Sequence, residues 1–207
     1  MKKILIFDFD GTVVNSMPRL ADIASELINR YYGLSLEISR NLYILTSGLP
    51  FVEQLEYMFP GKKENRQIVE EFERQKEEDV MNEPLFPETK DVLAYLASQG
   101  HKIVISSSNF QHIMEEYMER CGLAPDLVLG HKEGFSKGKD HFDYIKDYFQ
   151  ADTEDLVFIG DSLRDFEKAR DNGVRFIGRI STFTEDDFRQ AGADQVIHDL
   201  RELMQVL

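Results

Sequence analysis

The chain has 207 residues, 42% of them hydrophobic, which is enough to bury one core and to carry a smaller inserted module. Its 24 lysines and arginines against 38 aspartates and glutamates give a formal charge of −14, which would repel a nucleic acid. The single cysteine, Cys121, excludes an internal disulfide framework, and no apolar run has membrane-spanning length. We therefore expect a cytoplasmic monomer or weak dimer that binds neither nucleic acid nor membrane.

The first elements in chain order are a short strand and a long helical stretch. The apolar run at residues 4–7 stops abruptly at Asp8, as is typical of a buried strand. Residues 17–86 then show helical periodicity without a convincing strand. Pro84 and Pro87 bracket the end of this stretch, which suits a domain boundary. We interpret the helical stretch as an insertion.

After the insertion, apolar runs alternate with helical patterns. Gly100, Gly122 and Gly173 end three of the helical patterns, at the position where glycine commonly ends a helix. Strands that alternate with helices through short links predict a parallel sheet with helices on both faces. The predicted strands are residues 103–105, 127–129, 157–159 and 174–177, and the predicted helices are residues 90–98, 111–120, 142–149 and 166–172.

Carboxylates gather where the predicted strands end. Asp8 and Asp10 are two residues apart on an extended segment, so their side chains would project to the same side. Asp161 and Asp165 follow the strand at 157–159, and ligands of an open parallel sheet bind at this edge. Four carboxylates would repel a phosphate dianion, so a hard divalent cation is needed, and Mg²⁺ fits this ligand set.

Donor groups are predicted at the same edge. Ser106 and Ser107 follow the strand at 103–105 and offer hydroxyl and N–H donors to a transferring phosphoryl group. Lys137 offers one positive charge in a short loop before a helix. Each of these residues alone is typical of a turn or of the protein surface. Their combination indicates phosphate chemistry.

The chain resembles the haloacid dehalogenase-like superfamily in four motifs that occur in the order typical of that family. They are Asp8-Phe9-Asp10-Gly11-Thr12, Ser106, Lys137 and the motif from Gly160-Asp161 to Asp165. The resemblance covers essentially the whole chain and points to the branch of phosphoglycolate phosphatases and β-phosphoglucomutases, which carries a helical cap. It implies an α/β fold with a three-layer, Rossmann-like core and a parallel sheet. The implied domains are the core at residues 1–14 and 87–207 and the cap at residues 15–86.

The resemblance also implies roles for the four aspartates. Asp8 matches the nucleophile that forms an aspartyl-phosphate, and Asp10 matches the acid/base that serves the leaving alcohol and then the water. Asp161 matches a metal ligand, together with Asp8 and the backbone carbonyl of Asp10. Asp165 would orient the waters of the metal or Lys137.

Further residues are implied to bind the phosphate. Ser106, Ser107 and Lys137 match the groups that hold the phosphoryl oxygens. Many relatives have Lys-Pro where this chain has Lys137-Gly138, so Lys139 stays open as an alternative contact.

In the cap, Ser47, Gly48 and Phe51 are candidates to line the closed pocket, although packing between cap helices explains Phe51 equally well.

The predicted function is therefore Mg²⁺-dependent hydrolysis of a small phosphorylated metabolite. The retained Asp10 argues against a dehalogenase, and Phe51 stands near the place where sugar-phosphate mutases carry a cap arginine. A phosphomutase is the alternative enzyme, and a non-catalytic binding protein is the alternative outside catalysis. The histidines are scattered without ligand spacing, and none is assigned a catalytic role.

Overall fold

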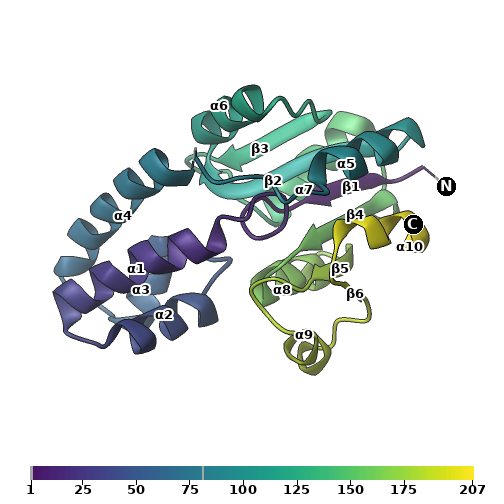
Figure 1. Ribbon diagram of the computed structural model, residues 1–207. Helices are drawn as coiled ribbons and strands as arrows, with labels where there is room; N and C mark the ends of the chain where they lie inside the picture. The colour runs from purple at the N-terminus through teal and green to yellow at the C-terminus, as the bar shows by residue number, and fades with distance from the viewer. Residues whose placement is uncertain (1, 81) are drawn as a thin grey trace. The chain divides into compact units, whose positions relative to one another are not determined.

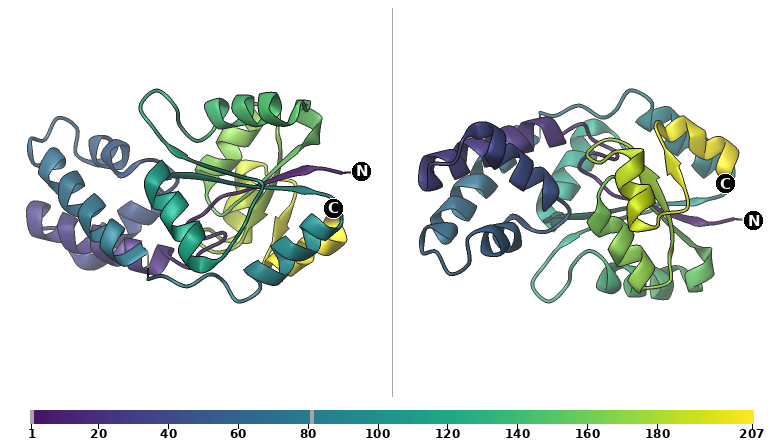
Figure 2. Two further views of the ribbon diagram at one scale, coloured as in Figure 1. Left: turned by 90° about the horizontal axis from the view of Figure 1, so that it is seen from above. Right: turned by 90° about the horizontal axis from the view of Figure 1, so that it is seen from below.

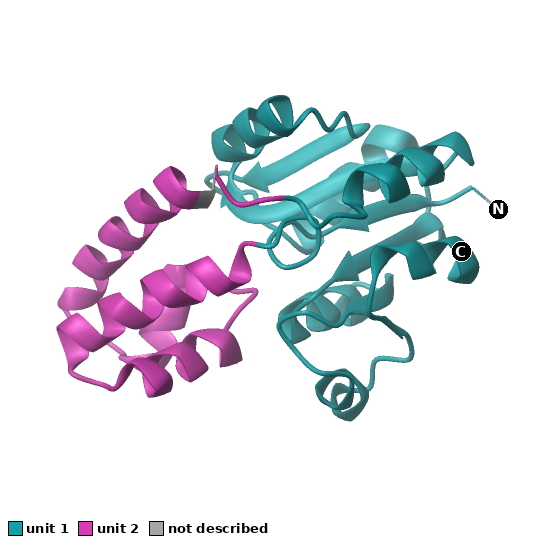
Figure 3. Cartoon of the chain, viewed as in Figure 1, with its two compact units in different colours: residues 1–15, 85–207 teal, residues 16–84 magenta. Residues whose placement is uncertain are grey.

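The structure is a computed structural model that describes residues 2–80 and 82–207 (Figure 1). The chain divides into two compact units, coloured separately in Figure 3. Unit 1 comprises Met1–Asn15 and Leu85–Leu207, and unit 2 comprises Ser16–Pro84. The chain therefore leaves the first unit once and returns to it once.

A six-stranded parallel sheet forms the centre of unit 1, in the order β3-β2-β1-β4-β5-β6. In its middle, Phe7 of β1 lies opposite Ile105 of β2 and Ile159 of β4. Every residue of β1 is buried, which explains its uninterrupted apolar sequence. The strands are β1 (Ile4–Phe7), β2 (Lys102–Phe110), β3 (Leu127–His131), β4 (Leu156–Gly160), β5 (Arg175–Arg179) and β6 (Val196–Ile197).

Helices cover both faces of the sheet. The strands progress in one direction from β1 to β3 and in the opposite direction from β3 to β6. Right-handed crossovers therefore place the helices that connect β1 to β3 on one face and those that connect β3 to β6 on the other. Figure 2 shows α5, α6 and α10 on one face and α7 and α8 on the other. The helices of unit 1 are α5 (Thr89–Ser98), α6 (Gln111–Cys121), α7 (Lys139–Phe149), α8 (Leu163–Asp171), α9 (Glu185–Ala191) and α10 (Leu203–Val206).

These elements confirm the predicted α/β fold, with two differences. The second strand continues past Ile105 to Phe110, and its pairing with β3 becomes irregular between Ser106 and Phe110. The polar run predicted to follow the strand is therefore part of it. The edge strand β6 was missed, because two residues are too short to give an alternation pattern.

Within its described residues, unit 2 consists of four helices and the turns and loops that follow them. The helices are α1 (Met17–Tyr32), α2 (Leu36–Leu45), α3 (Phe51–Met58) and α4 (Glu64–Val80). Its core includes the rings of Phe51 and Phe72, whose centroids lie 4.0 Å apart, and Tyr43 packs against both. The charges of α4 pair along its exposed side, as in Arg66–Glu70. The role of this unit as a cap stays a prediction.

None of the helices in the described ranges combines the length and the apolar character needed to span a bilayer.

Candidate active site

A tight loop follows the central strand β1. The amide of Asp8 donates to the carbonyl of Ile159 at 2.8 Å and so continues the pairing with β4. The carbonyl of Phe9 then accepts the amides of residues 12–14, and the amide of Gly11 donates to Val14 at 2.8 Å. Gly11 has φ +76°, a left-handed conformation that favours glycine. This loop fixes Asp8 and Asp10 at the carboxyl end of the sheet's central strand.

Three buried carboxylates and one lysine meet at this edge. Oxygens of Asp8, Asp161 and Asp165 lie within 4.8 Å of one another, and the residues are 6%, 3% and 0% exposed. The Nζ of Lys137 lies 2.6 Å from Asp8 Oδ1 and 2.6 Å from Asp165 Oδ1. With every group ionised, three negative charges against one positive charge leave a net charge of −2 in a buried site. A divalent cation would balance that charge.

The pKa values reflect this crowding. Burial raises the pKa of Asp8 well above its ordinary value; Lys137 opposes the rise, while Asp165 and Asp161 add to it. Burial and the charge of Asp165 raise the pKa of Asp161 to about 7. Burial alone would lower the pKa of Lys137, but Asp165 and Asp8 outweigh it and hold that pKa above its ordinary value. Lys137 is therefore a fixed positive charge at neutral pH.

Local geometry explains how Asp165 reaches the cluster. Ser162 caps α8: its Oγ accepts from the amide of Asp165 at 3.1 Å and donates to Asp165 Oδ2 at 2.8 Å. A Cβ at Gly160 would lie 2.8 Å from the side chain of Asp165. The glycine before Asp161 is thus required by the close approach of the first turn of α8.

The end of β2 supplies polar contacts beside the cluster. Ser106 is fully buried and shares a hydrogen bond of 2.8 Å with Nδ1 of His141. Ser107 Oγ accepts from the amide of Asn109 at 3.0 Å, and Asn109 Nδ2 donates to Asp10 Oδ2 at 2.8 Å. Asn109 therefore joins the end of β2 to the predicted acid/base.

Three of these neighbours were missed in the sequence. Asn109 was not among the predicted site residues, and its position two residues after Ser107, at the end of β2, was the available signal. His141 carried no sequence signal; burial and Lys137 lower its pKa to about 3, so its imidazole is neutral. Thr182, in the loop after β5, donates from Oγ1 to Asp161 Oδ2, and no motif marks it.

The two candidate lysines occupy different environments. Lys139 pairs with Asp143 on α7, and its side chain is 74% exposed. The structure thus brings Lys137, and not Lys139, to Asp8. Among the described residues, the side chain of Asp10 is not part of the carboxylate cluster, and the predicted contribution of its backbone carbonyl stays a prediction.

The predicted specificity loop lies in unit 2. Phe51 is buried against Phe72 in the core of that unit, which agrees with the packing alternative. Gln54 supports the loop: its Oε1 accepts from Thr46 Oγ1 and its Nε2 donates to Leu49, both at 2.9 Å. Ser47 is buried and Gly48 has φ +88°. A role for these residues in specificity stays a prediction.

Comparisons with known proteins agree with this fold and site. The family model described as haloacid dehalogenase-like hydrolase matches residues 5–179. The phosphoglycolate phosphatase of Synechococcus elongatus is 26% identical, over 82% of this chain and 80% of its own length. The phosphoglycolate phosphatase of Vibrio parahaemolyticus is 23% identical, over 99% and 96%. A haloacid dehalogenase-like family protein from Streptococcus pneumoniae superposes with a TM-score of 0.84 at 18% identity, over 99% and 98%, which shows the shared fold.

The chain belongs to the haloacid dehalogenase-like hydrolase family. Within that family it is a phosphatase, a phosphoric monoester hydrolase. The buried carboxylate cluster suits the metal ion that such phosphatases use.

Proposed function

We propose that the chain is a Mg²⁺-dependent phosphatase that hydrolyses a small phosphate monoester through an aspartyl-phosphate on Asp8. The observation that carries this proposal is the buried Asp8 carboxylate at the end of the central strand, held by Lys137 at 2.6 Å beside Asp161 and Asp165. A nucleophile needs such a fixed position, and a transferring phosphoryl group needs the adjacent positive charge.

In the first step, an oxygen of Asp8 attacks phosphorus while the bond to the leaving oxygen breaks. Asp10 donates a proton to that leaving oxygen, and the product alcohol departs. In the second step, Asp10 takes a proton from water, which attacks phosphorus and releases inorganic phosphate from Asp8. Asn109, which donates to Asp10 Oδ2, fixes the orientation of this acid/base in both steps.

The remaining polar residues act on charge and position. Ser106, Ser107 and Lys137 are the proposed ligands of the phosphoryl oxygens. Asp8, Asp161 and the backbone carbonyl of Asp10 would hold Mg²⁺, which when bound would offset the negative charge of the phosphate. Three carboxylates against one lysine fit a divalent cation on charge alone. Asp165 orients Lys137 through their contact at 2.6 Å.

The proposed substrate is a small phosphorylated metabolite. Relatives of this chain are named as phosphoglycolate phosphatases, so phosphoglycolate belongs in any test. We propose that unit 2 is the cap, which recognises the part of the substrate remote from phosphorus.

The test is phosphate release from phosphoglycolate, a hexose phosphate, a nucleoside monophosphate and p-nitrophenyl phosphate, each with Mg²⁺ and with EDTA. We expect Mg²⁺-dependent release that Asp8→Asn abolishes and that Asp171→Asn, at an exposed carboxylate, leaves unchanged. Mass spectrometry of acid-quenched enzyme should locate the phosphoryl group on Asp8. Release that survives in Asp8→Asn would contradict the mechanism, and turnover that requires a bisphosphate activator would indicate the phosphomutase alternative.

A further inference from the structure

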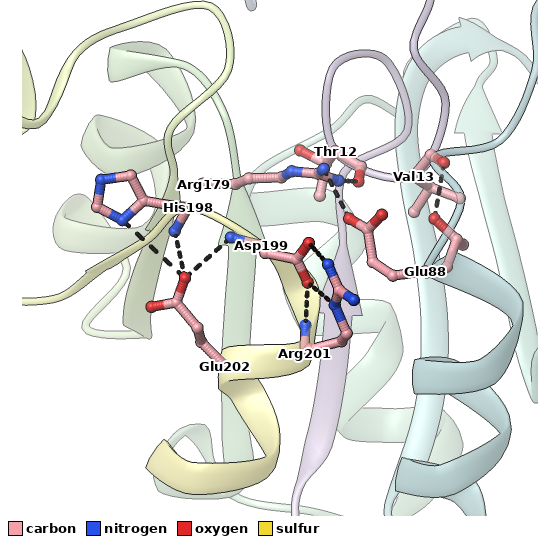
Figure 4. A network of polar contacts seen from close by, with 9 residues as sticks. Thr12, Val13, Glu88, Arg179, His198, Asp199, Arg201 and Glu202 are labelled. Carbon is pink, nitrogen blue, oxygen red and sulfur yellow. Dashed lines mark hydrogen bonds and ion pairs between the residues drawn. The ribbon is translucent and has the colours of Figure 1, made fainter.

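A buried arginine, Arg179, contacts the loop that carries Asp8 and Asp10. Arg179 is the last residue of β5 and is 4% exposed. Its Nη1 donates to the carbonyl of Thr12, and its Nη2 donates to Glu88 Oε1 at 2.8 Å (Figure 4). The guanidinium also lies 3.5 Å from the ring centroid of Phe86. One side chain thus contacts two segments that are far from it in sequence.

The two segments are also joined to each other. Val14 and Leu85 form an antiparallel bridge. The carbonyl of Val13 accepts from the amide of Phe86 and from Oγ1 of Thr89, both at 3.1 Å. The chain leaves unit 1 after Asn15 and returns to it at Leu85. The segments at which the chain leaves and re-enters unit 1 are therefore hydrogen-bonded to each other, and Arg179 contacts both.

The charges explain why this contact is specific. Arg179 and Glu88 are both buried, with side chains 4% and 7% exposed, so each is the counter-charge that makes burial of the other tolerable. A planar guanidinium can donate in two directions while its face packs on an aromatic ring, which an ammonium group cannot reproduce. Three residues further along, Thr182 donates to Asp161. The end of β5 and the loop after it therefore contact two parts of the site, the carbonyl of Thr12 and the carboxylate of Asp161.

We propose that Arg179 and Glu88 are positioning residues, which hold the loop of residues 8–14 in the geometry that Asp8 and Asp10 need for catalysis. Neither residue touches the reacting atoms. Arg179 acts through the carbonyl of Thr12, two residues after Asp10, and Glu88 acts by fixing the direction of the guanidinium. The inference rests on the proposed function for its kinetic readout, whereas its structural readout is independent of activity.

The structural readout is hydrogen exchange of the amides of residues 12–14, which all donate to the carbonyl of Phe9. We expect faster exchange of these amides in Arg179→Met. Arg175→Met, at the exposed opposite end of β5, is the matched control and should leave them unchanged. Unchanged exchange in Arg179→Met would overturn the proposal even if the wild-type protein hydrolysed none of the esters.

The kinetic readout separates positioning from stability. Arg179→Met should lower kcat about 10- to 100-fold with little change in KM, because small misplacements of catalytic groups are that costly. Arg179→Lys should recover part of kcat. The double variant Arg179→Met/Glu88→Leu leaves no unpaired buried charge, so its thermal stability should return toward that of the wild type.

In that double variant kcat should stay low, since the carbonyl of Thr12 still lacks its donor. Recovery of kcat together with stability would show that the pair is merely structural and would overturn the proposal. Absence of phosphate release from every ester by the wild type would instead refute the proposed function, and the exchange experiment would then decide on the positioning role.

Discussion

Removal of one buried carboxylate should stabilise the metal-free protein at alkaline pH. We predict that Asp161→Asn, measured in EDTA at pH 8, unfolds at a higher urea concentration than the wild type. Asparagine has nearly the shape of aspartate and can still accept a hydrogen bond from Thr182, but it brings no charge into the cluster with Asp8 and Asp165. The same substitution should abolish the stabilisation by added Mg²⁺.

The magnitude follows from the pKa of Asp161, which lies at about 7 instead of 3.8. One pKa unit corresponds to ~1.4 kcal/mol, so ionising Asp161 costs ~4 kcal/mol more in the folded protein than in the unfolded chain. Between these two pKa values the folded state binds more protons than the unfolded state. The free energy of unfolding of the metal-free wild type therefore falls as pH rises from about 4 to about 7. The Asp161→Asn variant escapes this part of the loss.

Urea unfolding at pH 5 and pH 8, with EDTA and with Mg²⁺, tests the prediction. At pH 5 in EDTA the variant should be more stable by only ~1–2 kcal/mol, because pH 5 lies about one unit above the ordinary pKa of an aspartate and well below the pKa of about 7 of Asp161 in the folded protein. At pH 8 the variant should be more stable by several kcal/mol, while an Asp171→Asn control should follow the wild type at both pH values. A variant less stable than the wild type at pH 8 without metal would refute the argument that burial and the charge of Asp165 make ionisation of Asp161 costly.

Three further predictions concern individual side chains. Lys137→Gln should lower kcat/KM about 100-fold or more, whereas Lys139→Gln should change it less than about twofold, because only the former contacts Asp8; equal effects in steady-state kinetics would contradict the assignment. Asn109→Ala should lower kcat about tenfold at constant KM, since Asp10 loses its donor, and an effect on KM alone would argue against that role. Phe51→Ala should destabilise the protein by about 3–5 kcal/mol in thermal or urea unfolding; a raised KM without destabilisation would show that Phe51 contacts substrate.

The parallel sheet was predictable because its central strands are buried on both faces and so read as continuous apolar runs. This pattern marks β1 and β4 clearly. It fails for β2 beyond Ile105, where buried polar residues such as Ser106 are made tolerable by hydrogen bonds that the sequence does not reveal. It also fails for Val196–Ile197, which is too short to show a period.

The carboxylate cluster was predictable for a topological reason. Residues that directly follow parallel strands lie at one edge of the sheet, which made Asp8 and Asp161 candidates for one site. They meet because β1 and β4 are neighbouring strands, an order that the sequence does not reveal. His141, Thr182 and Arg179 reach the site by packing, from a helix, a loop and the end of a strand. Such residues lack a fixed spacing to the motif residues, and only the folded chain reveals their contacts.

The bridge between Val14 and Leu85 makes the whole of unit 2 the equivalent of a surface loop. The chain leaves unit 1 and returns to it at neighbouring positions. The entropic cost of closing the segment between them grows only with the logarithm of its length, so a longer segment would cost little more. Insertions can lengthen or replace the helices of unit 2 without altering the register of β1. Unit 2 can thus change in length and sequence while the loop of residues 8–14 keeps its shape.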